Sequence, residues 1–497
     1  MRRIAEYIKS NSSGTIIYVF LVVSILLLIT VILNHGLYIG LALSFLPLTV
    51  LVIYFLIRNP FLALSVLFIL NYYVSGLSRY ITVLSPGITM DILIVLVIII
   101  ILLNILSGKQ SVELSNIVNG LTFAAFIWLI YCVFLVLNPT NFSFYGWFQS
   151  ARGVTIYFLL ISLISALILK KFKEVRYMLY IWAVLSLTAV LKAYIQKNFG
   201  FDYAEWRWLY ASGGRTHIIN TGIRYFSFYP DAANFGTGIA FAGVVFGFVA
   251  LTFKDKWAKI FFIFTSAACA YGMMISGTRG SLAVPFVGMF VYAILSRKFN
   301  ILIVSVIATA LAFGILKYTD IGSGNVFVRR MRTAFDPSDA SFKVRIDNQA
   351  KLRDYMQDKP FGAGIGMARK RSDKYEPNYY LSKIPTDSWY VLIWVETGIV
   401  GLILHLGILI YIVGYGTFLV YFKLRDREVK GVVMSLVSGI SGVYVASYSI
   451  EIMGQFPTGF ILYLGMTIIF LSPKFDKELI EKEESLLLLS EADEKEM

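Results

Sequence analysis

The chain has 497 residues, of which 58% are hydrophobic and 15% are charged, and its formal net charge is +14. A soluble domain could not bury this much apolar surface, and the recurring apolar runs are each long enough to cross about 30 Å of hydrocarbon. The runs lack the alternation of a barrel, so the spans are expected to be helical. The positive charge is spread over short segments between the runs, where it fixes membrane orientation, and this argues against nucleic acid as a partner.

The chain begins with Met1-Arg2-Arg3, which is basic enough for a signal peptide. The apolar run over residues 15–33 is longer than a typical signal core, and no small-x-small cleavage site follows it. We therefore predict that this run is the first retained membrane span. Cys132 and Cys269 lie inside later apolar runs, which predicts buried thiols and no disulfide.

Fourteen apolar runs are candidate membrane helices. In chain order they cover residues 15–33, 37–57, 61–78, 90–106, 117–137, 154–169, 176–195, 235–253, 257–276, 281–296, 300–316, 388–421, 431–450 and 457–472. With the N-terminus in the cytoplasm, most basic residues between spans fall on the cytoplasmic side, as the positive-inside rule requires. The acidic segment after Lys477 would also be cytoplasmic, as a solvated tail or a short helix.

Three sizeable loops then face away from the cytoplasm, over residues 138–153, 196–234 and 317–387, and the short turn Ser276–Ser281 faces the same way. The third loop holds more Lys and Arg than Asp and Glu. Positive charge is normally kept on the cytoplasmic side in short loops. This basic loop therefore needs another reason, and an anionic substrate supplies one.

Within the long loop, the stretch from Ser338 to Asp358 is predicted to be helical, because Asp336 or Ser338 can cap it and Pro360 follows its end. Four basic residues project from this helix, namely Lys343, Arg345, Lys351 and Arg353. Gly362–Gly366 follows, and its glycines allow tight turns and close backbone approach. The stretch lacks the Lys and Ser/Thr of a Walker loop, so it is a weak phosphate motif.

Two arginines outside that helix have alternative interpretations. Arg279 lies in a turn of a few residues between two apolar runs. It either extends to the membrane interface or holds a lipid diphosphate there, because a guanidinium pairs with phosphate oxygens. Arg224 begins an aromatic stretch that leads into a span. That stretch is either an interfacial aromatic belt with Asp231 or Asn234 as a helix cap, or a platform on which sugar rings pack beside Arg224.

Two carboxylates stand near the next span. Asp387 can cap the helix or act as a general base that takes a proton from an acceptor hydroxyl. Glu396 lies nine residues later, about 13 Å along a regular helix and on the opposite face, so the two form no paired-carboxylate site. Glu396 is either functional or a packing residue, and packing is favoured. Lys192 and Glu451 are the other main charges among the spans.

The histidines do not indicate a metal site. His35, His217 and His405 are scattered and show no metal-ligand spacing. The outer loops also lack an Asp-x-Asp type of acidic cluster, which argues against a metal-dependent sugar transferase.

The residues assembled so far resemble the O-antigen ligase and O-antigen polymerase superfamily of bacterial cell envelopes, over about residues 220–420. Ser276–Gly280 looks like the family's Ser-x-x-Arg-Gly turn, and Arg345 with Pro360–Gly366 looks like its loop arginine and Pro-x-x-Gly-x-Gly segment. Asp387–Gly401 looks like its His-Asn-x-Tyr…Glu-Thr-Gly-x-x-Gly segment. Arg224–Gly236 resembles a further, weaker pattern of the family.

One position departs from the family. Its ligases typically have His where this chain has Asp387, and Asn where it has Ser388. Asp can still accept a proton or orient an acceptor. The departure points away from ligases that use lipid A-core and towards a polymerase or a ligase with another acceptor. The resemblance implies no metal or other cofactor, and it implies the following roles: Arg279, Arg345 and Asp387 catalytic; Arg224, Asn234, Tyr390 and Arg353 substrate-binding.

The expected fold is an all-α polytopic membrane protein of about 14 helices, or 12 to 14, similar to GT-C glycosyltransferases. A large, partly helical extracytoplasmic loop interrupts the helices. We divide the chain into N-terminal membrane helices (1–219), membrane helices with the outer arginine motifs (220–316), the extracytoplasmic loop (317–387), C-terminal membrane helices (388–472) and an acidic cytoplasmic tail (473–497).

The function that the resemblance implies is transfer of an undecaprenyl-diphosphate-linked glycan to a glycan, lipid A-core or other hydroxyl acceptor. The enzyme would lie among the lipids of the bacterial inner membrane, with both termini in the cytoplasm and the active site on the outer side. The sequence does not separate a polymerase from a ligase. The alternative is a transporter or flippase of polysaccharide or lipid-linked oligosaccharide. Such proteins place charges or broken helices near the membrane centre, often in repeated halves, and here the spans hold few charges and no visible repeat.

Overall fold

The computed structural model describes residues 46–83, 85–108, 112–140, 143–219, 222–335, 340–368, 372–374 and 378–496. The chain divides into two compact units, residues 1–63 and 64–497. In the first unit, α3 (Leu46–Arg58) is an apolar helix with a basic residue in its last turn. The second unit holds the candidate site.

Eleven continuous helical stretches in the described chain are long and apolar enough to cross a membrane. They are α4 (Pro60–Tyr80), α5 (Pro86–Leu106), α6 (Gly120–Phe134) with η2 (Leu135–Leu137), α7 (Phe144–Ala151) with η3 (Arg152–Ile156) and α8 (Tyr157–Ile168), α9 (Phe172–Asn198), α12 (Ala232–Thr252), α13 (Lys256–Ile275), η5 (Arg279–Leu282) with α14 (Ala283–Ser296), α18 (Trp389–Phe422), α19 (Arg427–Ala446) and α20 (Thr458–Glu496). Each coincides with a predicted span, so the all-α polytopic membrane fold is confirmed.

The structure describes the other three predicted spans to different extents. The run 15–33 lies outside the described residues, and 37–57 is described only from residue 46, where α3 begins. The run 300–316 forms α15 (Phe299–Tyr318), which packs mainly on α14.

Short elements connect the long helices. They are η1 (Leu114–Ile117), α10 (Tyr203–Trp208), η4 (Leu209–Gly213), α11 (Gly214–His217), the antiparallel pair β1 (Ile218–Ile219) and β2 (Gly222–Ile223), α16 (Val326–Arg332), η6 (Thr333–Phe335), α17 (Ala340–Met356), η7 (Ser372–Lys374) and η8 (Tyr380–Lys383). Helix α17 confirms the helix predicted in the long loop, and the proposed cap at Asp336 or Ser338 lies outside the described residues.

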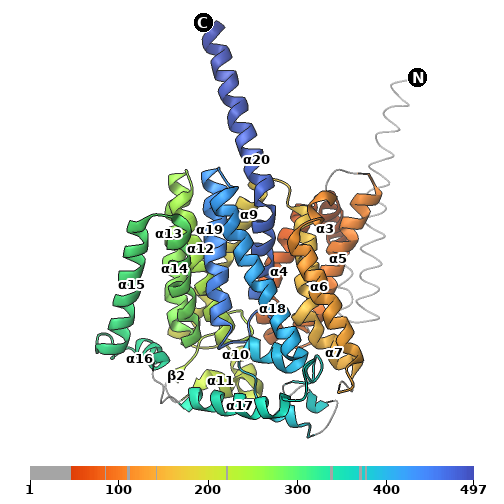
Figure 1. Ribbon diagram of the computed structural model, residues 1–497, viewed down its shortest axis with the longest axis vertical. Coiled ribbons are helices and arrows are strands. Elements are labelled where there is room, and N and C mark those ends of the chain that lie inside the picture. Colours follow the sequence, from red (N-terminus) through yellow and green to blue (C-terminus); the bar gives the residue numbers. More distant parts are fainter. Residues whose placement is uncertain are drawn as a thin grey trace, which may run out of the picture. The chain divides into compact units, whose positions relative to one another are not determined.

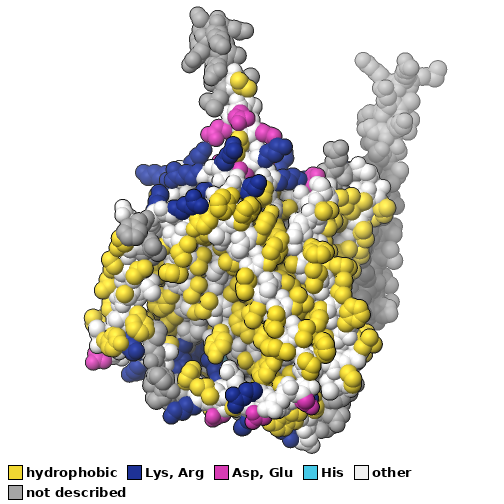
Figure 2. Space-filling view, viewed as in Figure 1, with side chains coloured by type: hydrophobic (Ala, Val, Ile, Leu, Met, Phe, Trp, Pro, Cys, Tyr) yellow, Lys and Arg dark blue, Asp and Glu magenta, His cyan; other side chains and the backbone are white. Residues whose placement is uncertain are grey.

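Within residues 64–497, α10, α11, α16 and α17 gather at one end of the long helices, which we call the loop end (Figure 1). Helix α20 projects from the opposite end. Lys and Arg side chains surround the base of α20, while the middle of the surface is apolar (Figure 2). This banded surface is typical of a membrane protein, with a lipid-facing belt between two polar ends.

Helix α12 occupies the centre of the second unit. It packs against α13, α19, α14 and α9. Many small residues allow this closeness: a side chain at Gly439 of α19 would press into Phe241 of α12, and one at Gly243 would touch Cys269 of α13. Small residues of this kind let membrane helices approach closely, where packing rather than water release drives association. Both cysteines are buried and free, as predicted.

Helix α20 differs from the predicted division into a span and a tail. It is continuous from Thr458 to Glu496, through Pro473. Beyond the span, Asp476 accepts hydrogen bonds from the N–H groups of Arg425 and Asp426 at 2.9 and 2.7 Å. The first turns after Pro473 are therefore tied to the start of α19 rather than free in solvent.

Candidate active site

The turn Ser276–Gly280 carries Arg279 between α13 and α14. Gly277 has a φ of 60°, a left-handed conformation that glycine adopts without strain. A side chain at Gly280 would collide with the hydroxyl of Ser449, in the loop between α19 and α20. The small residues of the turn are therefore required by its shape and packing, and they fix where the Arg279 backbone stands.

Arg279 bonds to the segment that covers this turn. Its Nη1 donates to the carbonyl and the hydroxyl of Thr333 at 3.2 and 3.1 Å. Arg330, on α16, donates from Nε to the carbonyl of Gly277. A Cβ added to Gly277 would lie 3.1 Å from Cδ of Arg330 and 3.6 Å from Cγ of Arg224. Arg330 and Arg224 therefore flank the turn.

Arg224 also bonds to the turn, since its Nη2 donates to Oγ1 of Thr278 at 2.9 Å. Burial lowers the pKa of Arg224; Asp231 opposes this shift, while the positive charges of Arg279 and Arg345 add to it. The charges of Arg279 and Arg345 therefore both act on Arg224, which puts the three arginines singled out in the sequence within electrostatic range of one another. Arg279 comes from a membrane turn, Arg224 from the loop before α12, and Arg345 from α17.

We call Arg224, Arg279, Arg330 and Arg345 the arginine cluster. Their positive charges lie at the loop end, and the partial burial of Arg224 strengthens its interaction with other charges. Guanidinium groups bind phosphate oxygens through paired, charge-assisted hydrogen bonds. The arrangement can therefore hold an anion with several oxygens, such as a diphosphate.

His217 holds the Arg224 segment in place. Its Nε2 accepts from the N–H of Ala232 at 3.1 Å, so Nδ1 carries the proton and donates to the carbonyl of Gly213 at 2.8 Å. The backbone carbonyl of His217 accepts from the N–H of Arg224 at 2.9 Å. Burial lowers the pKa of His217 to about 4. The neutral ring is therefore a structural link between the short hairpin and α12.

The start of α12 shows which of Asp231 and Asn234 caps the helix. Asp231 is the N-cap, and its carboxylate accepts from the N–H groups of Ala233 and Asn234 at 2.7 and 2.8 Å. Asn234 is buried, donates to Gln455 at 3.2 Å and accepts from Thr458. The side chain of Asn234 thus joins α12 to the last loop and to α20.

The aromatic stretch after Arg224 is not an open sugar platform. Phe226 and Tyr229 are completely buried. The guanidinium of Arg79 lies 4.3 Å from the ring centroid of Phe226 and 4.5 Å from that of Trp208, and it donates to the carbonyl of Ser227 at 2.7 Å. These contacts build the core beneath the loop end, so the platform alternative is wrong for these two rings.

Asp387 is exposed and has a φ of 50°, which is uncommon for a residue with a side chain. The helix cap is the next residue, because Ser388 is the N-cap of α18 and accepts from the N–H of Val391. The capping alternative for Asp387 is therefore wrong. The carboxylate is held just outside the helix end, in a backbone conformation of the kind that gathers at functional sites.

Glu451 is a second carboxylate beside this position. The hydroxyl of Thr386 donates to Oε1 of Glu451. The sequence places Glu451 among the charges of the spans, whereas in the structure it lies in the loop between α19 and α20. A polar residue between two apolar runs does not by itself indicate a site, and the bond to Thr386 brings Glu451 to the residue that precedes Asp387.

The loop 447–457 joins the two parts of the site. Its Ser449 lies against Gly280, beside Arg279. Its Glu451 receives the bond from Thr386, beside Asp387. The arginine turn and the carboxylates therefore contact the same short loop, which limits how far apart they can lie.

The glycine-rich segment Pro360–Gly366 has a structural role that the sequence does not reveal. Helix α18 is broken at Gly398, which has a φ of 74° and a ψ of −177°. The N–H groups of Ala363 and Gly364 donate to the carbonyls of Val395 and Glu396 at 2.8 and 3.1 Å, and the carbonyl of Pro360 accepts from Val400. The segment thus satisfies backbone groups released by the break, which apolar surroundings require.

Two glycines make this junction possible. A Cβ at Gly398 would collide with the carbonyl of Pro360, and a Cβ at Gly362 would lie 2.6 Å from the carbonyl of Glu396. Asn138 secures the same segment by donating to the carbonyl of Gly362 at 3.0 Å. The segment fixes the long loop to α18 and does not form a phosphate cradle.

The remaining predicted residues lie apart from the cluster or are used in packing. The hydroxyl of Tyr390 donates to the carbonyl of Tyr444 on α19 at 2.7 Å. Arg353 is 73% exposed, with Nε 3.8 Å from a carboxylate oxygen of Asp354. Lys192 pairs with the buried Glu205 at 3.0 Å. Glu396 is buried where the glycine-rich segment meets α18.

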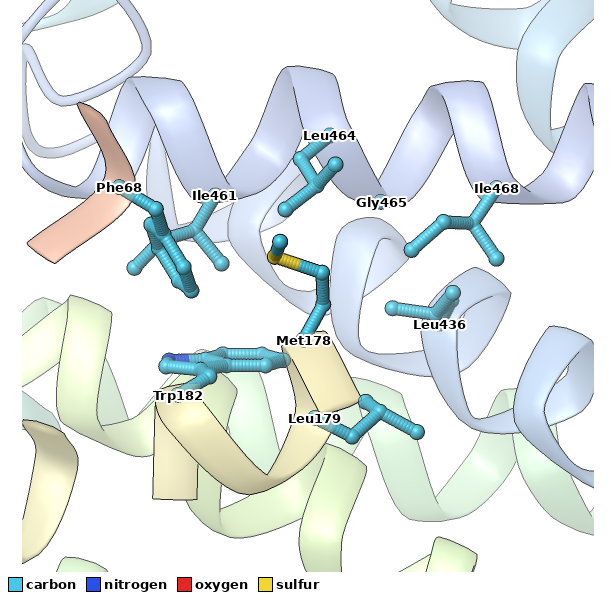
Figure 3. Close-up of a pocket in the computed structure, with 9 residues that line it drawn as sticks. All are labelled: Phe68, Met178, Leu179, Trp182, Leu436, Ile461, Leu464, Gly465 and Ile468. Carbon is cyan, nitrogen blue, oxygen red and sulfur yellow. The ribbon is translucent and has the colours of Figure 1, made fainter. Parts of the chain in front are cut away.

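A cavity among α4, α9, α19 and α20 lies elsewhere (Figure 3). Its volume is about 10 Å³, and its lining residues include Phe68, Met178, Trp182, Leu436 and Ile468. Room for at most one water and an apolar lining make this a packing void. It has no role in binding a large anionic substrate.

Comparison with known proteins supports the resemblance. Residues 261–406 match the family model described as O-Antigen ligase. This region runs from α13 into α18 and contains Arg279, Arg330, Arg345 and Asp387, together with the glycine-rich segment. A comparison with curated protein sequences finds no match. The matched part of the chain is therefore similar to O-antigen ligases in the region that holds the candidate site.

Proposed function

We propose that the protein is a membrane glycosyltransferase that moves a glycan from undecaprenyl diphosphate to an acceptor hydroxyl in the synthesis of an envelope polysaccharide. The observation that carries this proposal is the arginine cluster, in which Arg224 and Arg330 flank the turn that carries Arg279, and the charge of Arg345 acts on Arg224. The similarity of residues 261–406 to O-antigen ligases supports the same class of reaction.

The loop end is proposed to face away from the cytoplasm of a bacterial inner membrane. The basic residues that surround the base of α20 (Figure 2) support this orientation, because positive charge favours the cytoplasmic side. Arg279 would then stand at the outer surface, at the depth of a lipid diphosphate. The arginines 224, 330 and 345 would approach the same group from the water side.

The proposed chemistry is one displacement. An acceptor hydroxyl oxygen bonds to the anomeric carbon of the donor, and the bond from that carbon to the diphosphate oxygen breaks. The electron pair stays on the leaving diphosphate, and the arginine cluster stabilises its growing charge. The hydroxyl proton passes to a carboxylate, for which Asp387 and its neighbour Glu451 are the candidates. The positive charges of the cluster would serve in place of a metal ion.

A transporter is the competing class, and the break of α18 at Gly398 is the observation that favours it. Transporters use discontinuous helices to bind ions and substrates with released backbone groups. Here Pro360, Ala363 and Gly364 bond to those groups. The break is therefore better explained as the anchor of the long loop.

Turnover of a purified lipid-linked glycan by the full-length protein in detergent tests the proposal. We expect glycan transfer to an added acceptor glycan with a metal chelator present. Dependence on a divalent metal would contradict the metal-free mechanism. Transbilayer movement of the lipid-linked glycan in proteoliposomes without any transfer product would establish the transporter instead.

The envelope glycan of a deletion strain separates the two enzyme types. Loss of a polymerase leaves single repeat units on the final anchor. Loss of a ligase leaves long chains on undecaprenyl diphosphate. The replacement of the family's His by Asp387 leads us to expect the first result, or a ligase whose acceptor is not lipid A-core.

A further inference from the structure

Three tyrosines gather on the outer surface of the long loop. The rings of Tyr355, near the end of α17, and Tyr380, at the start of η8, are stacked with centroids 5.1 Å apart. The hydroxyls of Tyr355 and Tyr379 lie 3.3 Å apart. The ammonium of Lys359 lies 4.4 Å from the ring centroid of Tyr355. Tyr355 is thus packed by its neighbours, and Tyr380 remains 45% exposed on top of it.

This surface faces water and not lipid. Helix α17 lies across the ends of the long helices at the loop end (Figure 1). The residues that surround the rings carry charge, and Asp358 is 79% exposed beside Lys359. An interfacial aromatic belt would instead surround the apolar band of the membrane helices.

From Tyr380 to Asp387 the chain forms the short 3-10 helix η8 (Tyr380–Lys383) and then alternates between exposed and buried residues. Tyr380, Lys383, Pro385 and Asp387 are exposed, whereas Leu381, Ser382, Ile384 and Thr386 are buried. The exposed side therefore leads from the tyrosine ring to the carboxylate. Seven residue steps separate Tyr380 from Asp387. They would span at most about 25 Å if fully extended, and they span less here because Tyr380–Lys383 is helical. An oligosaccharide of several sugars can cover this length.

We propose that Tyr380, supported by Tyr355, is a platform that binds the acceptor glycan at a distance from the reacting hydroxyl. The flat C–H faces of sugar rings pack on aromatic rings, and tyrosine supplies a large, rigid contact area with little loss of rotamer entropy. Lys383 lies on the same exposed side and can donate hydrogen bonds to sugar hydroxyls. The platform makes the enzyme favour long acceptors over short ones. This inference rests on the proposed function.

Binding of glycan fragments tests the platform separately from catalysis. The probes are oligosaccharides released from the envelope polysaccharide of the producing strain, separated into one repeat unit and several repeat units. We expect the full-length protein to bind the longer fragment more tightly, and Tyr380→Ala to weaken that binding about tenfold. Tyr380→Phe keeps the aromatic face and should bind as the unsubstituted protein does.

Two matched controls sharpen the measurement. Tyr203→Ala removes a tyrosine that is 82% exposed in another loop at the same end, and it should change nothing. Arg329→Ala should also leave fragment binding unchanged, because Arg329 is an exposed residue of α16 outside the arginine cluster. If Tyr380→Ala lowers thermal stability, Tyr380→Leu keeps apolar packing on Tyr355 without a flat ring and should show the same loss.

The outcomes distinguish the inference from the proposed function. Equal affinity of the unsubstituted protein and Tyr380→Ala for the longer fragment, with glycan transfer intact, overturns the platform and leaves the function standing. Failure of the unsubstituted protein to bind either fragment also overturns it. Absence of any transfer by the unsubstituted protein overturns the proposed function instead.

Discussion

Arg330 donates a hydrogen bond from Nε to the carbonyl of Gly277, in the turn that also carries Arg279. This bond, with the bonds from Arg279 to Thr333, fastens α16 and η6 over the turn. The segment therefore brings a fourth guanidinium to a place where the sequence predicts three. In the proposed mechanism it contributes directly to the charge that faces the diphosphate.

Arg330→Ala is expected to reduce kcat/KM for glycan transfer roughly a hundredfold, the usual cost of removing one donor that stabilises transition-state charge. Arg329→Ala is the matched control, because Arg329 is the exposed neighbour on the same helix. The measurement is initial-rate kinetics of both purified variants, with thermal stability recorded alongside. An equal loss of kcat/KM in the two variants would mean that Arg330 contributes only to the overall positive charge of the loop and has no specific role.

The junction between Gly362 and Gly398 predicts a sharp difference between two glycines of α18. Gly398→Ala adds a methyl group where the carbonyl of Pro360 lies and where φ is positive. Backbone strain alone should lower the free energy of unfolding by about 1–3 kcal/mol, and the collision with Pro360 should lower it further. Gly407→Ala meets open space on the same helix and should be neutral or slightly stabilising. Thermal unfolding in detergent compares the two. Similar stabilities would mean that the glycine-rich segment does not depend on this contact.

The carboxylate pair predicts an unusual rescue. Asp387→Ala should lose about 10²–10⁴-fold in kcat, the range of general-base catalysis. Asp387→His should recover part of it, because the family's ligases typically use His there. Glu451→Gln, assayed alone and combined with Asp387→Ala, shows whether Glu451 shares the proton transfer. A Glu451→Gln loss as large as that of Asp387→Ala, and not additive with it, would mean that the two act as one unit.

His217 predicts an acid-sensitive loop end. Burial lowers its pKa from 6.5 to about 4, so the unfolded chain binds a proton more readily than the folded one between these values. Stability from this group is full above pH about 6.5 and is lost as pH falls towards 4, by up to about 3 kcal/mol. Stability against pH for the unsubstituted protein and His217→Gln checks this. The variant, which has no titrating ring, should lack this component, and an identical pH dependence would contradict the assignment.

Much of the fold could be predicted because membrane helices depend on local apolar length. All eleven described spans coincide with apolar runs in the sequence. The cap of α12 could be narrowed to Asp231 or Asn234 because capping acts within three residues, and the structure shows that it is Asp231. Asp387 was not separable from Ser388 as a cap by the same reasoning, since both residue types cap helices well.

The rest of the site depends on contacts between distant segments. Nothing in Val326–Arg332 distinguishes Arg330 from Arg329 and Arg332 until α16 folds onto the turn. Glu451 gains its place only through the bond to Thr386. The sequence leaves the aromatic stretch after Arg224 open between an interfacial belt and a sugar platform, and only the folded chain shows that Phe226 is buried beneath Arg79.

The central claim is that the arginine cluster holds the diphosphate of the donor. The most direct measurement is transfer from a purified lipid-linked glycan, with chelator present, by the Arg279→Ala, Arg345→Ala double variant beside Arg329→Ala. We expect the double variant to remain folded, with the small loss of thermal stability that follows from removing the bonds between Arg279 and Thr333, and to lose at least about 10³-fold in kcat/KM. Arg329→Ala should stay near the unsubstituted rate. Full transfer by the double variant would contradict the assignment of these arginines.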